Sequence, residues 1–136
     1  ALFHPGGSLG KRLLTKVYDV MKKENLPIVS MDTSSKDIIH TITNGKCGLA
    51  IVLNSDNCIE GIITDGDIRR VMESKEEQFF SLDASSIMSK NPKFIDENTK
   101  LIEASDLMSE NKINSLIVID EEKKLSGIVQ MYDLGI

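Results

Sequence analysis

One sequence motif occurs twice in this 136-residue chain, and its two copies lie 66 residues apart. The first copy is Gly61–Asp67, with the sequence GIITDGD, and the second is Gly127–Asp133, with the sequence GIVQMYD. The similarity extends back through apolar, turn and capping positions, where Ile28, Thr33, Ile51 and Asn54 are followed at the same spacing by Phe94, Thr99, Ile117 and Asp120. A repeat of this length indicates two copies of one supersecondary unit.

Each copy has the pattern strand, helix, strand, strand, helix. In the first copy we expect an extended segment at 26–29, a helix capped by Thr33 or Ser34 and stopped at Gly45, a buried strand at 49–53, a turn at 54–57, a strand at 58–64, and a helix capped by Asp67 that runs from 68 towards 74. The predicted fold class is therefore α+β, built from two β-α-β-β-α repeats.

Two further segments lie outside this pattern. Apolar spacing predicts an amphipathic helix over residues 8–24, in one piece or two. Residues 75–85 are expected to connect the copies, with Phe79 and Phe80 as a local hydrophobic anchor. Ile87-Met88 follows Val20-Met21 at a spacing of 67, so the register slips by one residue near Pro27 and Pro92.

A small sheet covered by helices on one face leaves its other face apolar. We expect the two repeats to cover each other's open face about a pseudo-twofold axis. Such packing creates clefts between strand ends and helix starts, where helix N-termini offer free N–H groups to anions.

Composition excludes several classes of function. The net charge of −5 argues against nucleic acid as a partner, because phosphate backbones need a basic face. No apolar run approaches the roughly 20 residues that span a bilayer, and residues 1–7 do not resemble a signal peptide. Cys47 and Cys58 lack a CxxC spacing, so we predict no metal site and a cytoplasmic protein with reduced thiols.

The motif at 61–67 carries the groups that a phosphorylated ligand needs. Asp67 offers a carboxylate to the two hydroxyls of a ribose, and Thr64 offers a hydroxyl to a phosphate. Arg69 and Arg70 add positive charge. The alternative is purely structural: Asp67 caps its helix and Thr64 ends its strand. Asp65-Gly66-Asp67 also suggests calcium, but the other acidic positions of an EF-hand loop are missing.

The duplicated pattern resembles a tandem pair of CBS domains, also called a Bateman module. In that family, Gly-hydrophobic-x-Thr/Ser-x-x-Asp/Asn marks nucleotide binding, and the first copy matches it with Gly61, Thr64 and Asp67. The second copy keeps Gly127 and Asp133 but has Gln130 at the hydroxyl position. The resemblance implies one good nucleotide site. Its candidate residues are Ile28, Cys47, Leu49, Thr64, Asp65, Asp67 and Arg69, with Asp133 at the second site.

The N-terminal stretch HPGGSLGKRLL, residues 4–14, resembles the end of the sugar-isomerase (SIS) domain of D-arabinose-5-phosphate isomerases. The resemblance implies a SIS remnant at 1–14, a first CBS repeat at 15–78 and a second at 79–136 that breaks off within its last helix. It makes His4 a catalytic candidate of the parent enzyme, inactive in this fragment. The chain itself is predicted to be non-catalytic.

The resemblance also implies partners and an effector. The expected partners are the SIS domain of the same chain and a second copy of the CBS pair, with a tetramer possible in the full protein. The expected effector is an adenine or cytidine nucleotide or CMP-Kdo, and no cofactor is expected. Two alternatives remain: a ligand-independent dimerisation scaffold, and the CBS pair of a sugar-nucleotide transferase.

Overall fold

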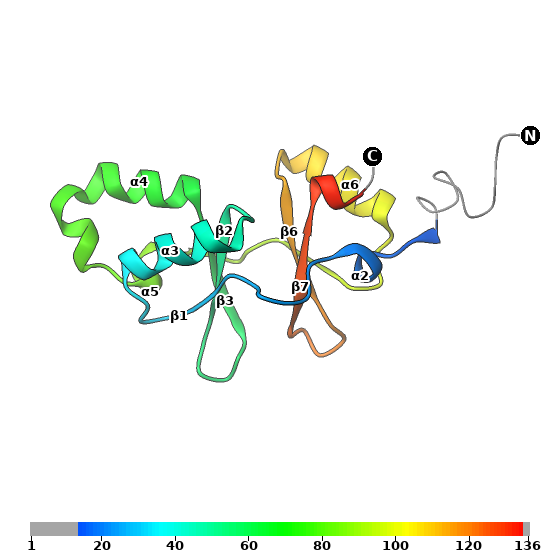
Figure 1. Ribbon diagram of the computed structural model, residues 1–136, viewed down its shortest axis with the longest axis horizontal. Helices are drawn as coiled ribbons and strands as arrows, with labels where there is room; N and C mark the ends of the chain where they lie inside the picture. Colours follow the sequence, from blue (N-terminus) through cyan, green and yellow to red (C-terminus); the bar gives the residue numbers. More distant parts are fainter. Residues whose placement is uncertain (1–13, 135–136) are drawn as a thin grey trace, which may run out of the picture. The chain divides into compact units, whose positions relative to one another are not determined.

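The computed structural model describes residues 14–134, which divide into two compact units. The first unit consists of Asn25–Pro92. The second unit combines the segment up to Glu24 with the chain from Lys93 onwards. Both mix helices and strands, as the sequence predicts, and they are described separately below (Figure 1).

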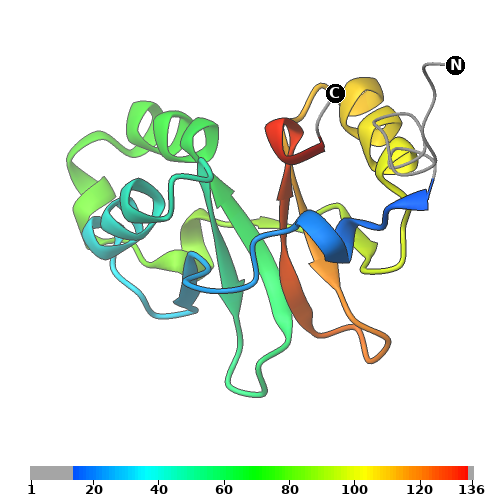
Figure 2. The same cartoon turned by 45° about the vertical axis from the view of Figure 1, so that its right-hand side comes forward.

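The first unit is built on a four-stranded sheet in the order β1-β2-β3-β4, formed by Ile28–Ser30, Leu49–Leu53, Ile59–Thr64 and Ser89–Lys90. The β1–β2 pair is parallel and the other two pairs are antiparallel. Its helical segments are α3 (Ser35–Gly45), α4 (Asp65–Lys75), the 3₁₀ helix η1 (Glu76–Ser81) and α5 (Ala84–Ile87). Figure 2 shows α3 and α4 on the same side of this sheet.

The second unit repeats this plan with a three-stranded sheet in the order β5-β6-β7, formed by Phe94–Asp96, Ser115–Ile119 and Leu125–Gln130. Its helical segments are α2 (Val17–Val20), α6 (Leu101–Asn111) and the 3₁₀ helix η2 (Met131–Leu134). Lys22 adds an isolated antiparallel bridge to Ile128 of β7. Lys22 thus takes the position that β4 occupies beside β3 in the first unit.

Strand alternation separates two faces in each sheet. In the first unit Val29, Ala50, Val52 and Ile63 pack with Ile38 and Ile42 of α3 in one apolar cluster. In the second unit Val118 and Val129 pack with Ala104 and Met108 of α6. Ala50 and Val52 belong to the segment 49–53, which the sequence predicts to be a buried strand.

The compact units do not coincide with the sequence repeats. The segment α2–Lys22 comes before the first repeat in sequence but packs in the second unit, where Lys22 pairs with β7. The segment α5–β4 comes before the second repeat but packs in the first unit, where β4 pairs with β3. The repeat spacing is 67 for α2 and α5 and 66 for the positive-φ residues Asn25 and Asn91. The extra residue therefore lies between Met21 and Asn25.

The structure corrects three predicted element boundaries. Of the helix predicted over 8–24, residues 8–13 lie outside the described residues, and the described part is helical at Leu14 and in α2. It stops at Val20, before the predicted end, because the chain extends at Met21 and Lys22 exchanges backbone hydrogen bonds with Ile128. Helix α3 ends at Gly45, but the left-handed cap is Lys46, with a φ of 55°. Gly45 is instead needed for close packing, since a Cβ there would lie 2.8 Å from Cβ of Pro27.

The third correction concerns the start of α4. The helix begins at Asp65 with Thr64 as its N-cap, three residues before the predicted start at Ile68. Asp67 is therefore the third residue of the helix rather than its cap. This position lets its side chain return to the backbone of Thr64.

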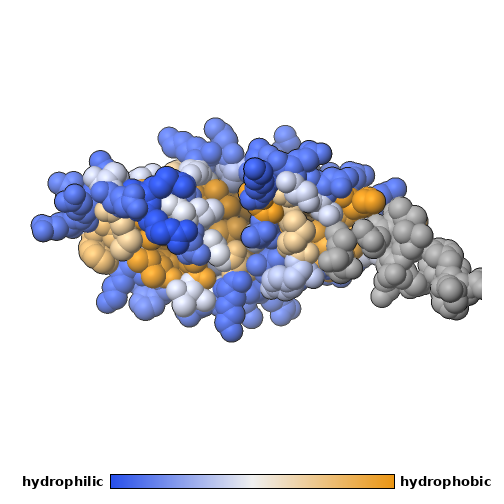
Figure 3. Space-filling model, turned by 90° about the horizontal axis from the view of Figure 1, so that it is seen from above, coloured by the Kyte–Doolittle hydropathy of each residue, from blue (hydrophilic) through white to orange (hydrophobic). Residues whose placement is uncertain are grey.

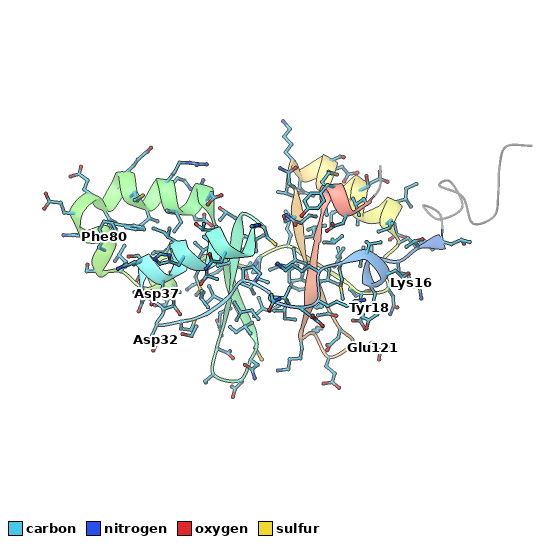
Figure 4. The ribbon with its side chains drawn as sticks, in the orientation of Figure 1. Lys16, Tyr18, Asp32, Asp37, Phe80 and Glu121 are labelled. Carbon is cyan, nitrogen blue, oxygen red and sulfur yellow. The ribbon has the colours of Figure 1, made fainter. Side chains whose placement is uncertain are left out.

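The predicted anchor of two phenylalanines holds for one of them. Phe79 is buried in the core of the first unit, whereas Phe80 is 67% exposed and meets Phe79 edge to face. Figure 4 labels Phe80, which belongs to η1, and Figure 3 shows hydrophobic surface among hydrophilic side chains at this end of the unit. Within residues 14–134, no helix has the length and apolar character to cross a membrane.

Candidate functional site

The candidate site lies where β3 ends and α4 begins. Thr64 is both the last residue of β3, paired with Leu49 of β2, and the N-cap of α4. Its Oγ1 accepts a hydrogen bond from the backbone N–H of Asp67 at 3.1 Å, while Asp67 Oδ2 accepts from the Thr64 N–H at 2.9 Å. This reciprocal capping box fixes the first turn of the helix.

Asp67 is the most constrained polar residue of the junction. Only 6% of it is exposed. Besides the bond from Thr64, its Oδ1 accepts hydrogen bonds from the Arg70 guanidinium and from Ser89 Oγ, the latter at 3.0 Å. A buried carboxylate needs such partners, because desolvation without them is unfavourable. The predicted structural alternative for this residue is therefore present, although it acts through a capping box rather than as the cap itself.

Arg70 and Asp65 are the exposed charges beside this capping box. The Arg70 side chain is 70% exposed and forms an ion pair with Asp67. It lies over Gly66, since a Cβ added there would stand 3.2 Å from Arg70 Nη1 and 3.6 Å from Thr64 Oγ1. Asp65 is exposed, and its Oδ2 lies 3.8 Å from the Cβ position of Gly48. Gly48 has a φ of +72° at the entrance to β2.

The sheet register brings three of the predicted residues to one face. Ile28 pairs with Ile51, and Leu49 pairs with Thr64, so Ile28, Leu49 and Thr64 share the face opposite to the helix-covered core. Ile28 is exposed and Leu49 is buried. Leu49 and Thr64 pair where β2 begins and β3 ends, and Ile28 lies opposite Ile51, two residues further along β2.

The remaining predicted residues differ in their placement. Cys47 is buried, and its Sγ donates to the Gly45 carbonyl at 3.2 Å. Arg69 is exposed on α4. Asp133 lies in the second unit, where its Oδ2 accepts from the Gln130 N–H at 3.1 Å. His4 lies outside the described residues.

The equivalent junction of the second unit is chemically different. Gln130 replaces the capping hydroxyl, and its Oε1 accepts a hydrogen bond from Tyr132 at 2.7 Å. The chain there forms the 3₁₀ helix η2 instead of the start of an α-helix. The bond from Gln130 N–H to Asp133 remains, so half of the capping box is conserved between the units.

Sequence reasoning missed Ser89 as a member of this site. Ser89 reaches Asp67 from β4, 22 residues further along the chain. No local motif includes it, because β4 joins the sheet only through tertiary pairing with Gly61 and Ile62. The sequence signal for it is the correspondence of Ile87-Met88 to Val20-Met21, which makes Ser89 the repeat counterpart of Lys22.

A hollow lies in the second unit, away from the predicted residues. It has a volume of about 610 Å³ and is lined by Lys16, Tyr18, Asp19, Glu97, Asn98, Asp120, Leu125 and Ser126. Figure 4 labels Lys16 and Tyr18 beside α2. Its carboxylates already accept local bonds: Asp19 from the Lys16 N–H, and Glu97 from Ser126 Oγ at 2.6 Å. These hydrogen bonds give Asp19 and Glu97 a structural role in the fold.

Comparison with known proteins identifies both repeats. The CBS domain model matches residues 17–74 and 84–134. Arabinose 5-phosphate isomerase KpsF of Escherichia coli is 42% identical over 133 residues, which cover 98% of this chain and 40% of that protein. Arabinose 5-phosphate isomerase KdsD of Francisella tularensis is 40% identical over 136 residues, with coverages of 98% and 41%. The chain thus spans about two fifths of the length of these curated relatives.

Solved structures agree with the family model at the level of the fold. The CBS-domain containing protein ATU1752 from Agrobacterium tumefaciens superimposes with a TM-score of 0.78 at 21% identity, covering 99% of this chain and 97% of that one. The structure of CBSX2 in complex with AMP gives a TM-score of 0.76 at 24% identity, covering 88% and 93%. Because the family model matches twice and spans most of the residues, this chain belongs to the CBS domain family and carries two CBS domains.

Proposed function

We propose that this chain is the regulatory CBS pair of an arabinose-5-phosphate isomerase, and that it binds a nucleotide or nucleotide sugar at the β3–α4 junction of the first unit. The observation that carries the proposal is the difference between the two junctions. Thr64, Asp67 and two exposed charges meet in the first unit, whereas Gln130 and Tyr132 occupy the corresponding place in the second. One site per chain is the expected stoichiometry.

The parent activity is inferred from the relatives. KpsF and KdsD are named arabinose 5-phosphate isomerases, and this chain aligns with 40% and 41% of their lengths. The remainder of such an enzyme would hold the SIS domain that interconverts ribulose 5-phosphate and arabinose 5-phosphate. His4 would then belong to the catalytic machinery of the parent, and a second CBS pair would be the natural dimer partner.

The ligand class is inferred from the site and from related structures. CBSX2 was solved in complex with AMP, and the CBS domain of a bacterial CNNM/CorC family Mg²⁺ transporter was solved in complex with ATP. Adenine nucleotides are therefore the first candidates, and cytidine nucleotides are included because of the pathway of the proposed parent enzyme. CMP-Kdo is a further candidate, because an end product of the parent's pathway is a suitable feedback signal.

Regulation requires a difference in affinity. A ligand shifts the parent enzyme between two states only to the extent that it binds them unequally. We expect binding at the first unit to bias the attached catalytic domain in this way.

A thermal-shift screen tests the proposal directly. The 136-residue chain is heated with AMP, ADP, ATP, CMP, CMP-Kdo or arabinose 5-phosphate. A ligand at 100 times its Kd adds about 2.7 kcal/mol of stability, which moves the melting temperature of a chain this size by several degrees. Thr64→Val is the matched control, because it removes the hydroxyl and keeps the side-chain shape. Each variant is compared with its own ligand-free melting temperature.

A ligand-independent scaffold is the second candidate function. The observation that favours it is the capping box, in which the Thr64 hydroxyl oxygen and the Asp67 carboxylate both accept backbone hydrogen bonds without any ligand. Sedimentation of the chain with and without nucleotide separates the two functions. A stable dimer whose sedimentation is unchanged by every nucleotide supports the scaffold. A dimer whose stability changes when a nucleotide is added supports the sensor. The CBS pair of a sugar-nucleotide transferase is the less favoured parent, because the relatives described above carry isomerase names.

A further inference from the structure

The hollow of the second unit has walls from three elements that backbone hydrogen bonds join together. Its lining residues belong to α2 with its N-cap, to the loop that follows β5, and to the β6–β7 hairpin. The Glu97 carbonyl accepts a hydrogen bond from the Tyr18 N–H at 3.2 Å, and the Glu97 N–H donates to the Ile119 carbonyl at 3.0 Å. The fold therefore fixes the shape of the hollow, and its volume of about 610 Å³ lies in the range of small-molecule sites.

The charged groups of this hollow are mainly hydrogen-bond acceptors. Three carboxylates line it, those of Asp19, Glu97 and Asp120, together with one lysine. Asp19 Oδ2 accepts a hydrogen bond from the Lys16 N–H at 3.1 Å. Glu97 Oε2 accepts one from Ser126 Oγ, and Asp120 Oδ1 accepts two from the backbone of its own hairpin. The second oxygen of each carboxylate has no partner among residues 14–134, so each remains available to a donor.

Tyr18 and Leu125 add an apolar wall beside these acceptors. Tyr18 is 45% exposed, and Lys23 Nζ lies 4.0 Å from the centroid of its ring. The negative potential of an aromatic face attracts ammonium groups, as this contact illustrates. The hollow therefore combines negative charge with a surface on which methylene groups can pack.

This combination favours an extended organic cation over an anion or a single metal ion. An anion would meet three carboxylates, which repel it. A metal ion holds its oxygen ligands at about 2.0–2.6 Å, so it would occupy only a small part of a hollow of 610 Å³. Within residues 14–134, no group of three acidic, His or Cys side chains is arranged to hold such an ion. A linear polyamine has several ammonium groups joined by methylene chains, so it can contact separate carboxylates at once.

We propose that the second unit binds a linear polyamine in this hollow, with its ammonium groups on the three carboxylates and its methylene groups against Tyr18 and Leu125. The site lies in the other unit from the β3–α4 junction and uses none of its residues. It is therefore a second ligand site, and it stands whether or not the junction binds a nucleotide.

Calorimetry on the 136-residue chain tests the site with spermidine, butylamine and Mg²⁺. Butylamine keeps one ammonium group and a methylene chain, whereas Mg²⁺ keeps multiple charge without the chain. The wild-type chain should bind spermidine about tenfold more tightly than either probe, because each additional ion pair near a surface contributes a factor of up to about 5.

Two variants remove charge from the hollow and retain the local hydrogen bonds. Glu97→Gln keeps a side-chain oxygen that can accept from Ser126. Asp120→Asn gives the turn the side chain that Asn54 provides at the equivalent position of the first unit, where it accepts the same two backbone bonds. Each variant should weaken spermidine binding by about threefold to fivefold. The melting temperature without ligand checks that each variant is folded.

Glu121→Gln and Glu122→Gln are the matched controls. Both side chains are exposed in the same hairpin, and neither lines the hollow; Figure 4 labels Glu121. These two variants should retain the wild-type affinity for spermidine. Lys16→Gln should strengthen binding, because it removes the positive charge of the lining.

Three results would overturn the proposal. The first is wild-type binding of spermidine that is absent or no tighter than that of butylamine. The second is a preference for Mg²⁺ over spermidine. The third is an equal loss of affinity in Glu97→Gln and Glu121→Gln, which would indicate diffuse attraction to an acidic chain.

An NMR titration of the wild-type chain decides the question if a hollow variant fails to fold. Spermidine should shift the amide signals of Tyr18 and Ser126 more than those of Glu121 and Glu122. Shifts spread evenly over the acidic surface would refute the site.

Discussion

The backbone carbonyl of Ser89 lies directly over Gly61. A Cβ added to Gly61 would stand 2.7 Å from that oxygen and 2.9 Å from Sδ of Met88. Gly127 has the same relationship in the second unit, where the added Cβ would meet the Lys22 carbonyl and lie 2.8 Å from Sδ of Met21. The glycine of the repeated motif is thus required for packing in both units, including the one that lacks the Thr64 hydroxyl.

Gly61→Ala is therefore expected to destabilise the chain. The new methyl group must displace the backbone of β4, and overpacking of this kind costs about 1–3 kcal/mol. Urea denaturation measures the loss. Gly66→Ala is the control, since its nearest neighbour is the tip of the flexible Arg70 side chain and alanine is favoured in a helix by about 1 kcal/mol. Equal stability of Gly61→Ala and the wild type would show that β4 moves freely.

Asp67→Ala should be more destabilising than Asp133→Ala. Asp67 accepts from Thr64, Arg70 and Ser89, whereas the bond described for Asp133 is the one from Gln130. Leaving these donors without their acceptor costs about 1–3 kcal/mol. Thermal unfolding of the two variants gives the comparison. Similar losses in both would mean that the Ser89 and Arg70 contacts contribute little to the fold.

Ser34→Ala should lower the stability of the chain, and Ser35→Ala should not. Ser34 is the N-cap of α3 and accepts from the Asp37 N–H at 3.3 Å, so its loss should cost about 1 kcal/mol. The Ser35 hydroxyl is fully buried and has no partner within residues 14–134. Removing it relieves an unsatisfied polar group, so Ser35→Ala should leave stability unchanged or raise it.

Melting temperatures of these two variants provide a matched pair, because the substitutions are chemically identical and adjacent. The second unit supports the expected sign for Ser35, since its repeat counterpart is the buried Leu101. A clear loss of stability in Ser35→Ala would indicate that its hydroxyl is bonded, for example through water.

Asp83 should make stability depend on pH in the acid range. The hydrogen bond from Ser85 Oγ, at 2.6 Å, is the main cause that holds the pKa of Asp83 below its ordinary value of 3.8, and the bonds from Ser86 act in the same direction. A pKa that is lower in the folded state adds stability above the unfolded value of 3.8. That stability disappears as pH falls through the folded pKa.

Asp83→Asn tests this sign. The wild type should exceed the variant in stability near neutral pH, and the difference should shrink below pH 3.8 as Asp83 is protonated. Carboxyl NMR of Asp83 should give a midpoint under the same value. A midpoint at or above it would contradict the role assigned to Ser85.

The spacing of 66 residues was sufficient to predict β1–β3 and β5–β7 and their order along the chain. The buried runs at Leu49–Leu53 and Ser115–Ile119 are apolar enough that burial is their only favourable environment in water. The turn at Asn54 was also predictable, because its side chain accepts hydrogen bonds from the N–H groups of Asp56 and Cys58. These bonds are local in sequence and stabilise the turn without tertiary contacts.

Helix boundaries near the site were less predictable. Thr64 and Asp67 both have side chains that can cap, and a choice between them depends on which one is fixed by the sheet. The pairing of Thr64 with Leu49 ends the strand at Thr64 and so makes it the cap. The end of the helical segment predicted over 8–24 was hard to predict for a similar reason, because Lys22 exchanges two backbone hydrogen bonds with Ile128 that a continuing helix would forgo.

The sequence by itself determined the α+β class, the duplication and the place of the candidate site, because these depend on local periodicity and on residue types within one short motif. Only the tertiary structure decided that Ser89 holds Asp67, that Gly61 lies under a β4 carbonyl, and that Lys22 pairs with Ile128. These contacts join groups 22, 28 and 106 residues apart in sequence, which meet only when the strands pair. Local propensity carries no information about such pairing.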